Sequence, residues 1–488
     1  MYSFIISVCL LVLGYLFYGK FVDRVFGADP NRVTPAVSKA DGVDFVPLHP
    51  MKVYMVQFLN IAGTGPIFGA IMGSKFGPSS YLWIVFGCIF AGAVHDYLAS
   101  MLSLRKGGAH LPELVGEYLG NGTRKVMLAF TIFLLLLVGA VFVYSPALIL
   151  GDIAQILPTA HASALFWCAV IFIYYVIATL LPIDKIIGKV YPLFSMALLF
   201  MAAALMACLF IRWPHIPEVW EGLGNRGPSL GMNGQSIFPC LFITIACGAI
   251  SGFHATQSPL MARCITNERM GRPIFYGAMI TEGIVALIWA AVGSYFFFDG
   301  GAAEVGATSS QAPVVVTSVA KSWLGVVGGI LAVLGVVAAP ITSGDTALRS
   351  ARLIVADLIH LDQKRKVNRL MVSIPIFAIC LLVLWFNIAN ADGFNVIWRY
   401  FGWGNQALAC FTFWTLTVWL ALERKHPYYL IALLPSAFMT SVCVTYICVD
   451  KIGFHMPSTW IPYIAVTVFA VSIVLFYSWL CRRTKVSE

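Results

Sequence analysis

The chain has 488 residues, of which 60% are hydrophobic and 11% charged, with a formal net charge of +9. Soluble domains are usually about half apolar and a quarter charged, so this composition excludes a water-soluble enzyme, a nucleic-acid-binding module and a disordered chain. At about 20 apolar residues for each bilayer crossing, the sequence has room for about a dozen membrane helices. In a membrane protein the excess of Lys and Arg is typical of cytoplasmic loops, so a lipid bilayer is the expected partner.

Hydropathy predicts an all-α membrane protein with about thirteen transmembrane helices. The apolar runs are continuous rather than alternating, which excludes a closed β-barrel. The expected crossings are 3–22, 51–73, 79–104, 124–150, 163–181, 186–212, 236–262, 273–298, 323–350, 369–388, 395–422, 427–449 and 458–481. The first lacks a basic leader and a small-residue cleavage site, so we interpret it as a retained helix. The twelve cysteines form no C-x-x-C pair, and we expect them to act as small hydrophobic residues.

The positive charges predict the orientation of the chain. If the N-terminus lies outside, 25 of the 31 Lys and Arg residues fall at the inner ends of the crossings. The six at the outer ends are Lys75, Arg212, Arg226, Lys321, Arg399 and Lys451. Since cytoplasmic loops carry the excess of positive charge, this split predicts an outer N-terminus and a cytoplasmic C-terminus.

Two crossings, 51–73 and 236–262, contain residues that interrupt a helix near its middle. Glycine and proline are the poorest helix formers, and polar side chains are rare at membrane depth. The residues concerned are Gln57, Asn60, Gly63, Thr64, Gly65 and Pro66 in the first crossing, and Gly248, Ser251, Gly252, His254, Thr256, Gln257 and Pro259 in the second. Either interruption taken alone is about equally consistent with a packing kink.

The spacing of the two interruptions indicates an inverted repeat. Without the first crossing they fall in helices 1 and 6 of the remainder, five helices apart, and the loop charges give them opposite directions. Inverted five-plus-five repeats hold substrate between such discontinuous helices near the midplane, so the residues of both interruptions, Gly248 and Pro259 excepted, are the predicted substrate-binding residues. The predicted division is an N-terminal helix and loop 1–50, a first repeat 51–212, an outer connector 213–235, a second repeat 236–422, and two C-terminal helices with a short tail 423–488.

Two further polar stretches leave alternatives open. The stretch 299–321 is too polar to span the membrane, and it is either an outer lid, a re-entrant segment or a surface loop. In the crossing 323–350, Asp345 lies four residues before Arg349, so the two can form a local ion pair at a helix end. Alternatively, the polar residues beside them face the core and take part in ion or proton coupling.

Ionisable residues elsewhere in the crossings are few. They are costly in hydrocarbon and usually face the bundle interior. Glu282 lies about ten residues into its helix, which favours a buried role. His95 and Asp96 lie near the cytoplasmic end of theirs, where an interfacial position is also consistent with the sequence.

Several strings resemble those of the carbon starvation protein family. They are Ile61-Ala-Gly-Thr-Gly-Pro66, Ala91-Gly-Ala-Val-His-Asp-Tyr97 with Arg105-Lys-Gly-Gly108, Ser251-Gly-Phe-His-Ala-Thr-Gln-Ser-Pro259 and Pro340-Ile-Thr-Ser-Gly-Asp-Thr-Ala-Leu-Arg-Ser-Ala-Arg352. The resemblance implies a multi-pass importer of the cell inner membrane, related to the leucine-transporter fold, with peptides and pyruvate as substrate classes. Where that family carries a Gly-His-His-Phe-type run, this chain has Met55-Val-Gln-Phe58, so the role of those histidines is not transferred.

Two residue sets compete for the coupling ion. Thr342 and Ser343 resemble the hydroxyl ligands of sodium-coupled relatives, and carbonyls near Ile61 and Ala62 would complete an oxygen cage. A proton would instead use ionisable side chains, because histidine titrates near neutral pH and burial raises the pKa of a carboxyl group. The resemblance favours a proton, with sodium as the alternative. The predicted coupling residues are His254, Asp345, Thr342, Ser343, Glu282 and Asp96.

Other function classes lack their sequence signatures. No G-x-x-x-x-G-K-[ST] loop for nucleotide and no H-E-x-x-H or G-x-S-x-G set is present, so neither a primary pump nor a membrane enzyme is expected. A channel would usually show a subunit-built pore rather than an inverted repeat. We therefore expect a secondary transporter without a cofactor or bound metal. A nutrient sensor on a transporter scaffold stays as an alternative.

Overall fold

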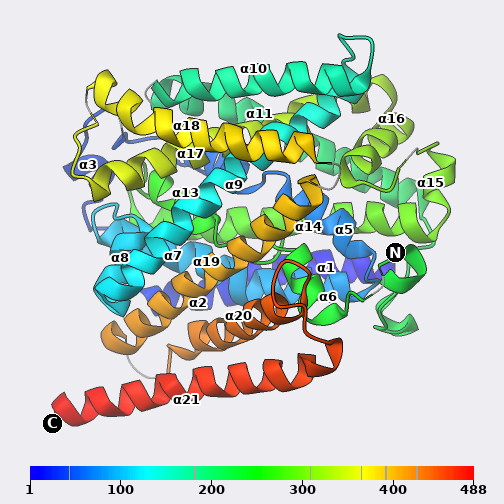
Figure 1. Ribbon diagram of the computed structural model, residues 1–488. Helices are drawn as coiled ribbons and strands as arrows, with labels where there is room; N and C mark the ends of the chain where they lie inside the picture. Colours follow the sequence, from blue (N-terminus) through cyan, green and yellow to red (C-terminus); the bar gives the residue numbers. More distant parts are fainter. Residues whose placement is uncertain are drawn as a thin grey trace.

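A computed structural model describes the chain except for Val43, 181–182, Asn233, Thr308, Lys364, 391–392, 425–426 and Glu488. Throughout the described residues the regular secondary structure is helical. The helices lie side by side in one bundle, and the two termini lie at opposite ends of it (Figure 1).

The long helices follow the predicted crossings closely. They are α1 (Tyr2–Leu13) with α2 (Gly19–Phe26), α6 (Ser79–Gly87) with α7 (Ala93–Arg105), α9 (Asn121–Ile153), α10 (Ala160–Leu180), α11 (Ile183–Arg212), α14 (Gly277–Phe298), α16 (Ala312–Leu331), α17 (Ala338–Leu358), α18 (Lys366–Ala389), α19 (Gly393–Glu423), α20 (Leu430–Val449) and α21 (Ile461–Ser487). Three short helices are α3 (Pro35–Ser38), α8 (Leu111–Leu119) and α15 (Gly301–Glu304). Helix α9 has 33 residues, which at 1.5 Å per residue is longer than the hydrocarbon core is thick.

Two segments are interrupted in the middle. The first consists of α4 (Pro50–Ile61), a π-helical turn Gly65–Gly69 and α5 (Ala70–Ser74), with a bend of 53° between its halves. The second consists of a π-helical turn Ile237–Leu241, α12 (Phe242–Thr244), an unwound stretch 245–253 and α13 (His254–Ala262). Both predicted breaks are thus present.

Within the described residues, eleven helices are long and apolar enough to cross a membrane, or twelve with the bent pair α4–α5. The predicted number of thirteen therefore stays a prediction, because the pieces of 236–262 are each too short to count. The structure also corrects the crossing expected at 323–350. Gly325, with φ 59° and ψ −143°, turns the chain inside α16, and the helix beyond it continues through Ala332–Val337 to the end of α17.

The polar stretch 299–321 contains α15 and the first part of α16, while Thr308 lies outside the described residues. Arg212 at the end of α11 donates to Glu304 Oε1 at 2.7 Å, and Tyr295 donates to Glu304 Oε2 at 2.5 Å. This stretch is therefore partly helical and tied to neighbouring helices. Whether it acts as a lid stays open.

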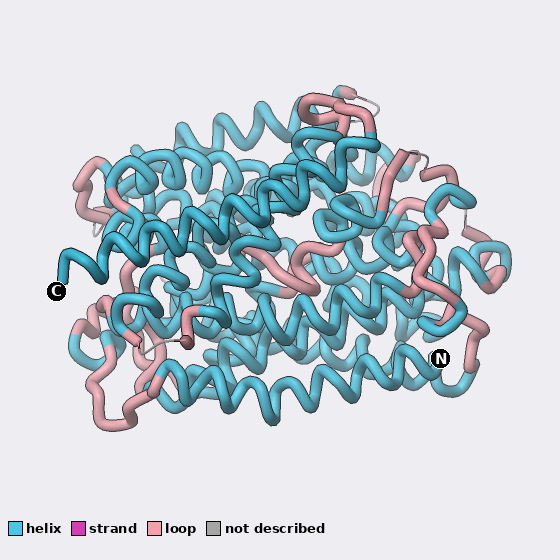
Figure 2. Tube along the Cα trace, turned by 90° about the horizontal axis from the view of Figure 1, so that it is seen from below, coloured by secondary structure: helices cyan, strands magenta, loops and turns pink. Residues whose placement is uncertain are grey.

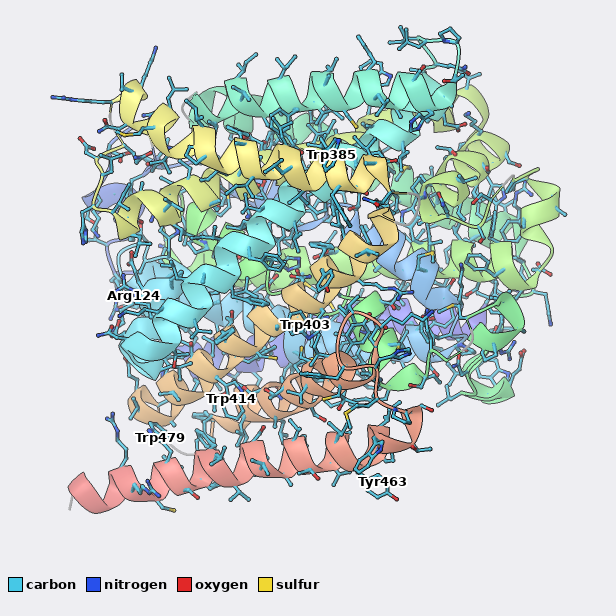
Figure 3. All side chains as sticks on the ribbon, viewed as in Figure 1. Arg124, Trp385, Trp403, Trp414, Tyr463 and Trp479 are labelled. Atoms are coloured by element: carbon cyan, nitrogen blue, oxygen red, sulfur yellow. The ribbon has the colours of Figure 1, made fainter. Side chains whose placement is uncertain are left out.

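Large apolar side chains cover the outside of the bundle. Trp385 on α18 and Tyr463 on α21 are each 68% exposed, and Figure 3 shows Tyr463 at the lower edge of the bundle. Trp403 and Trp414 on α19 instead pack between helices, because their indole groups donate to Cys443 O and Thr440 Oγ1 of α20. An apolar surface of this extent, around helices of spanning length, identifies a multi-pass membrane protein.

Candidate functional site

The two interrupted segments lie against each other and run in opposite directions. Gln57 Nε2 donates to Ser258 Oγ at 3.2 Å, which joins α4 to α13. At the level of the breaks, a Cβ added to Gly65 would lie 2.2 Å from Cys247 Sγ, and one added to Gly69 would lie 2.8 Å from the carbonyl oxygen of Thr244. Residue numbers rise along one segment as they fall along the other. In Figure 2, loop backbone accordingly interrupts the helices in the middle of the bundle.

The first break is short and is held from α17. Helix α4 ends at Ile61, and residues 62–64 are unwound before the π-helical turn that contains Gly65 and Pro66. Ser343 Oγ lies 3.1 Å from the carbonyl oxygen of Leu59 and 3.0 Å from that of Asn60. A helix that ends inside a protein leaves such carbonyls without intrahelical partners. The Ser343 hydroxyl donates to them and so caps the end of α4.

The second break is longer and is held from α19. Asn405 Oδ1 accepts hydrogen bonds from Phe253 N at 2.7 Å and from Ser251 Oγ at 3.1 Å. Its backbone carbonyl accepts from Gly252 N at 3.2 Å. Gly252 allows this approach, because a Cβ there would lie 2.4 Å from the Asn405 oxygen. Asn405 therefore bonds the last three residues before α13 through its side chain and its backbone carbonyl.

Buried polar atoms without partners gather beside the two breaks. Gln57, Asn60, Thr64 and Gln257 are fully buried. Among the described residues, no hydrogen-bond partner is found for Gln57 Oε1, Gln257 Oε1, Thr64 Oγ1 or either polar atom of the Asn60 amide. Leaving such groups unpaired costs about 1–3 kcal/mol each, and together they place several free donors and acceptors beside the two breaks.

Thr256 contributes differently from these four side chains. Its hydroxyl accepts from Gln257 Nε2 at 2.9 Å and donates to Phe253 O at 2.7 Å. Its carbonyl accepts from Ser350 Oγ of α17 at 3.2 Å. Thr256 therefore orients Gln257 and fastens the start of α13.

A chain of ionisable side chains lies next to the second break. Asp96 of α7 holds one histidine on each carboxylate oxygen: His95 Nδ1 lies 2.8 Å from Oδ1, and His254 Nδ1 lies 2.8 Å from Oδ2. On its other side, His254 Nε2 lies 3.5 Å from Oε2 of Glu282 on α14. All four side chains are fully buried. Asp96, His254 and Glu282, which the sequence predicted for coupling, thus meet, and the side chains of His95 and Asp96 are buried inside the bundle.

The protonation states of this chain are linked by its geometry. With both Nδ1 atoms donating to Asp96, His254 Nε2 is left to face Glu282. A carboxylate cannot donate, so one proton must lie either on Glu282 or on His254 Nε2 for the pair to attract. The 3.5 Å separation exceeds a normal hydrogen bond, and neither carboxyl oxygen of Glu282 has another partner among the described residues. The two side chains therefore face each other without a normal hydrogen bond, and they attract only when the pair carries one proton.

Asp345 and Thr342 belong to a separate cluster on α17. Tyr191 of α11 donates to Asp345 Oδ2 at 2.8 Å and lies 3.3 Å from the carbonyl oxygen of Thr342. Thr342 Oγ1 donates to Ala339 O of its own helix at 2.8 Å. Arg349 donates to Ala178 O at 2.8 Å. Of the residues predicted for coupling, Asp345 and Thr342 thus lie in this cluster, Asp96, His254 and Glu282 lie in the chain beside the second break, and Ser343 caps α4.

His95, Tyr191 and Asn405 are among the residues that the sequence analysis did not select and that bond directly to selected ones. His95 was identified only as an ionisable residue of its crossing. Asn405 and its neighbour Gln406 are two adjacent polar residues inside an apolar helix. That pattern is the sequence signal that could have identified Asn405 as a candidate site residue.

A bundle with two interrupted helices around buried unpaired polar groups is the architecture of membrane transporters. The chain belongs to the carbon starvation protein CstA family, which matches residues 1–157, 148–327 and 324–446. It is 45% identical to an uncharacterized membrane protein of Haemophilus influenzae, over 60% of this chain and 91% of that protein. The resemblance expected from the strings quoted above is confirmed.

Characterised relatives are more distant. The chain is 26% identical to the peptide transporter CstA of Escherichia coli, over 90% of this chain and 79% of that protein. It is 27% identical to the pyruvate/proton symporter BtsT of Escherichia coli, over 62% of this chain and 51% of that protein. The chain thus spans about half the length of BtsT.

Among solved structures, a crystal structure of the manganese transporter from Eremococcus coleocola has a similar fold. The TM-score is 0.57 at 12% sequence identity, over 91% of this chain and 98% of that one. Identity this low shows the shared fold alone. Within the described part of this chain, no group of three or more His, Cys, Asp or Glu side chains is arranged to hold a metal ion.

Proposed function

We propose that this protein is a secondary transporter that carries a small carboxylic acid or a short peptide together with a proton, by alternating access. The relatives named as a peptide transporter and a pyruvate/proton symporter supply the substrate classes. The membrane would be the cell inner membrane, with the N-terminus outside and the C-terminus in the cytoplasm, as the loop charges predict.

The observation that carries the proposal is the buried chain Glu282–His254–Asp96–His95. Its member His254 is the first residue of α13, directly after the second break, so the chain lies beside the unpaired amides that would bind substrate. A proton shared by Glu282 and His254 changes the charge next to α13 when it leaves. Substrate binding and proton binding would thereby influence each other through a single helix.

The opposite directions of the two interrupted segments support an inverted five-plus-five repeat, with 51–212 and 236–422 as its halves. In this arrangement the substrate would contact Gln57, Asn60, Thr64 and Gln257. Gly63, Gly65, Pro66 and Gly252 would give the backbone its course, and Ser251 would hold the second break against α19. These side chains offer amides, hydroxyls and half-helix ends, which suit a carboxylate or a peptide group.

The sodium alternative would use Thr342 and Ser343. The Ser343 hydroxyl donates to the carbonyl oxygens of Leu59 and Asn60, and Thr342 bonds within its own helix. Both hydroxyls therefore have structural partners, which favours the proton. Asp345 is a second proton candidate, because its Oδ1 has no hydrogen-bond partner among the described residues.

The test is uptake of labelled pyruvate and of dialanine into proteoliposomes that contain the full chain, in sodium-free buffer with an imposed pH gradient. We expect accumulation driven by the gradient. Glu282→Gln, His254→Gln and Asp96→Asn should lose accumulation while they retain exchange of substrate across the membrane, and Asp345→Asn is the matched variant for the competing cluster. Transport that requires sodium and moves no proton would contradict proton coupling.

Alternating access has its own test. Thr64 is fully buried and Thr256 is 3% exposed, so cysteines at these positions should react slowly in the closed form. In a background cleared of reactive native cysteines, substrate and protons should change the reactivity of Thr64→Cys and Thr256→Cys from both sides. Reactivity from one side only, under every condition, would indicate a nutrient sensor instead.

A further inference from the structure

We propose that a cavity in front of the two breaks is a docking site for the carboxylate group of the transported molecule, with Arg399 as the cation that binds it. The inference rests on the proposed function in that the transported molecule is a carboxylate, and it adds a second site that precedes the buried one.

The cavity has a volume of about 150 Å³ and is lined by both interrupted segments. Met72 comes from α5, and Ile243 and Thr244 come from α12. Helix α19 contributes Arg399 and Gly402. A cavity of this size holds several water molecules, so it has room for a carboxylate group together with further atoms of the transported molecule.

Arg399 is loosely held in this cavity. Its only ion pair among the described residues joins Nη1 to Asp450 Oδ1 at 3.9 Å, longer than the 2.7–2.9 Å of a charge-assisted hydrogen bond. Asp450 Oδ1 also accepts from Ile452 N at 3.1 Å, which fixes that carboxylate. The Arg399 side chain is 34% exposed and that of Asp450 10%. A guanidinium group in this position can turn one edge to an incoming carboxylate while Asp450 stays as its counterion.

The position of Arg399 on α19 connects the cavity to the second break. Gly402 lies one helical turn further along and also lines the cavity. Asn405 lies one turn beyond that and holds Ser251 and Phe253. At 1.5 Å per residue, Arg399 is about 9 Å along the helix from Asn405.

Aromatic side chains separate the cavity from the breaks. Trp398 lines the cavity, and its ring centroid lies 6.0 Å from that of Phe68 and 5.5 Å from that of Phe401. Phe142 lies 5.9 Å from Phe401 and 6.1 Å from Phe253 of the second break. The cavity would therefore be a first binding site, from which a carboxylate reaches the breaks only after these rings move.

The first experiment measures charge in the cavity without transport. In the full chain, with the reactive native cysteines replaced by serine, Met232→Cys places a thiol in the cavity wall. The reaction rate with the anionic sulfonatoethyl methanethiosulfonate, divided by the rate with the cationic trimethylammonioethyl reagent, should fall about fivefold when Arg399→Gln is added. Pyruvate should slow both reactions while Arg399 is present.

Arg212→Gln is the matched control, because Arg212 is 38% exposed and pairs with Glu304 rather than with a cavity residue. It should leave the ratio unchanged. An equal ratio in the presence and absence of Arg399 would overturn the docking site, whether or not the protein transports anything.

The second experiment measures transport. Arg399→Gln should raise the KM for pyruvate and for dialanine about tenfold, the loss expected for one hydrogen-bonded charge, and leave the maximal rate nearly unchanged. Arg399→Lys should give an intermediate KM. The KM for dialanine amide, which lacks the carboxylate, should not change. A carrier that transports pyruvate with the same KM in wild type and Arg399→Gln would contradict the docking site and leave the proposed function intact, whereas a wild type without transport would contradict the proposed function alone.

Discussion

The two breaks differ in length and in what holds them. The first leaves residues 62–64 unwound, and one hydroxyl group from α17 caps the helix that ends there. The second leaves residues 245–253 unwound, and Asn405 bonds three consecutive residues of it. The buried ionisable side chains described above, Glu282, His254, Asp96 and His95, all lie beside the second break. At the first break only three residues are unwound, and unpaired polar side chains lie beside them. At the second break nine residues are unwound, the ionisable His254 follows directly, and Asn405 of α19 bonds the end of the unwound stretch.

This difference indicates that the second break depends more on its surroundings. A three-residue break leaves few backbone groups to satisfy, and the helix pieces around it pair the rest. A nine-residue break leaves more, and in a membrane interior water does not replace them. The predictions below test that ranking, from the largest expected effect to the smallest.

Asn405→Ala should have the largest effect. It leaves the Phe253 N–H and the Ser251 hydroxyl buried without their acceptor, and at about 1–3 kcal/mol per group the free energy of unfolding should fall by about 2–6 kcal/mol. Asn387→Ala is the control, because both polar atoms of that buried amide lack partners among the described residues. Reversible denaturation in mixed micelles measures both. Equal losses in the two variants would refute the supporting role of Asn405.

Gly65→Ala tests the contact between the two breaks. The new methyl group would lie 2.2 Å from Cys247 Sγ, and such overpacking should cost about 1–3 kcal/mol of unfolding free energy. Cys247→Gly in the same chain should restore most of that loss, while Gly122→Ala, with open space around the added atom, should cost nothing. A double variant no more stable than Gly65→Ala alone would show that the two positions do not touch.

Ser343→Ala tests the first break. Loss of the cap on the Leu59 and Asn60 carbonyls should cost about 1 kcal/mol, less than the change at Asn405. Ser373→Ala is the matched control, because that buried hydroxyl has no partner among the described residues. An effect larger than that of Asn405→Ala would reverse the ranking of the two breaks.

Glu304 provides a reference contact that neither break uses. Its hydrogen bond from Tyr295 and its pair with Arg212 lower the pKa of this carboxyl group below its usual 4.5. A lowered pKa stabilises the folded state above the unfolded pKa, and that stability is lost as the pH falls below about 4.5. Because the group is exposed, solvent screening should keep the effect of Glu304→Gln below about 0.5 kcal/mol at neutral pH. Thermal unfolding in detergent at pH 7 and pH 3.5 should show a smaller difference from wild type at the lower pH, where Glu304 begins to be protonated in the folded state.

The sequence predicted those features that have local causes. Glycine and proline at Gly63, Gly65 and Pro66 located the first break within a few residues, and apolar runs located the long helices. It did not predict that His254 lies between Asp96 and Glu282, since that depends on how three distant helices pack. Asn405 acts on residues about 150 positions earlier, and no local pattern reports such a partner. The corrected boundary at 323–350 depends on the φ of one glycine, Gly325, which hydropathy does not reveal.

The close approach of the two interrupted segments limits which residues can occur together at facing positions in homologues. Gly65 faces Cys247, Gly69 faces Thr244, and Gly73 faces Ile245, with Cβ positions that would overlap the opposite residue. A larger side chain at Gly65 or Gly73 therefore requires a smaller one at Cys247 or Ile245, whereas Gly69 faces the backbone oxygen of Thr244, which no substitution removes. Across homologues the Gly65–Cys247 and Gly73–Ile245 pairs should covary. A chimera that takes one interrupted segment from a distant relative should fold poorly, whereas one that takes both together should keep the match.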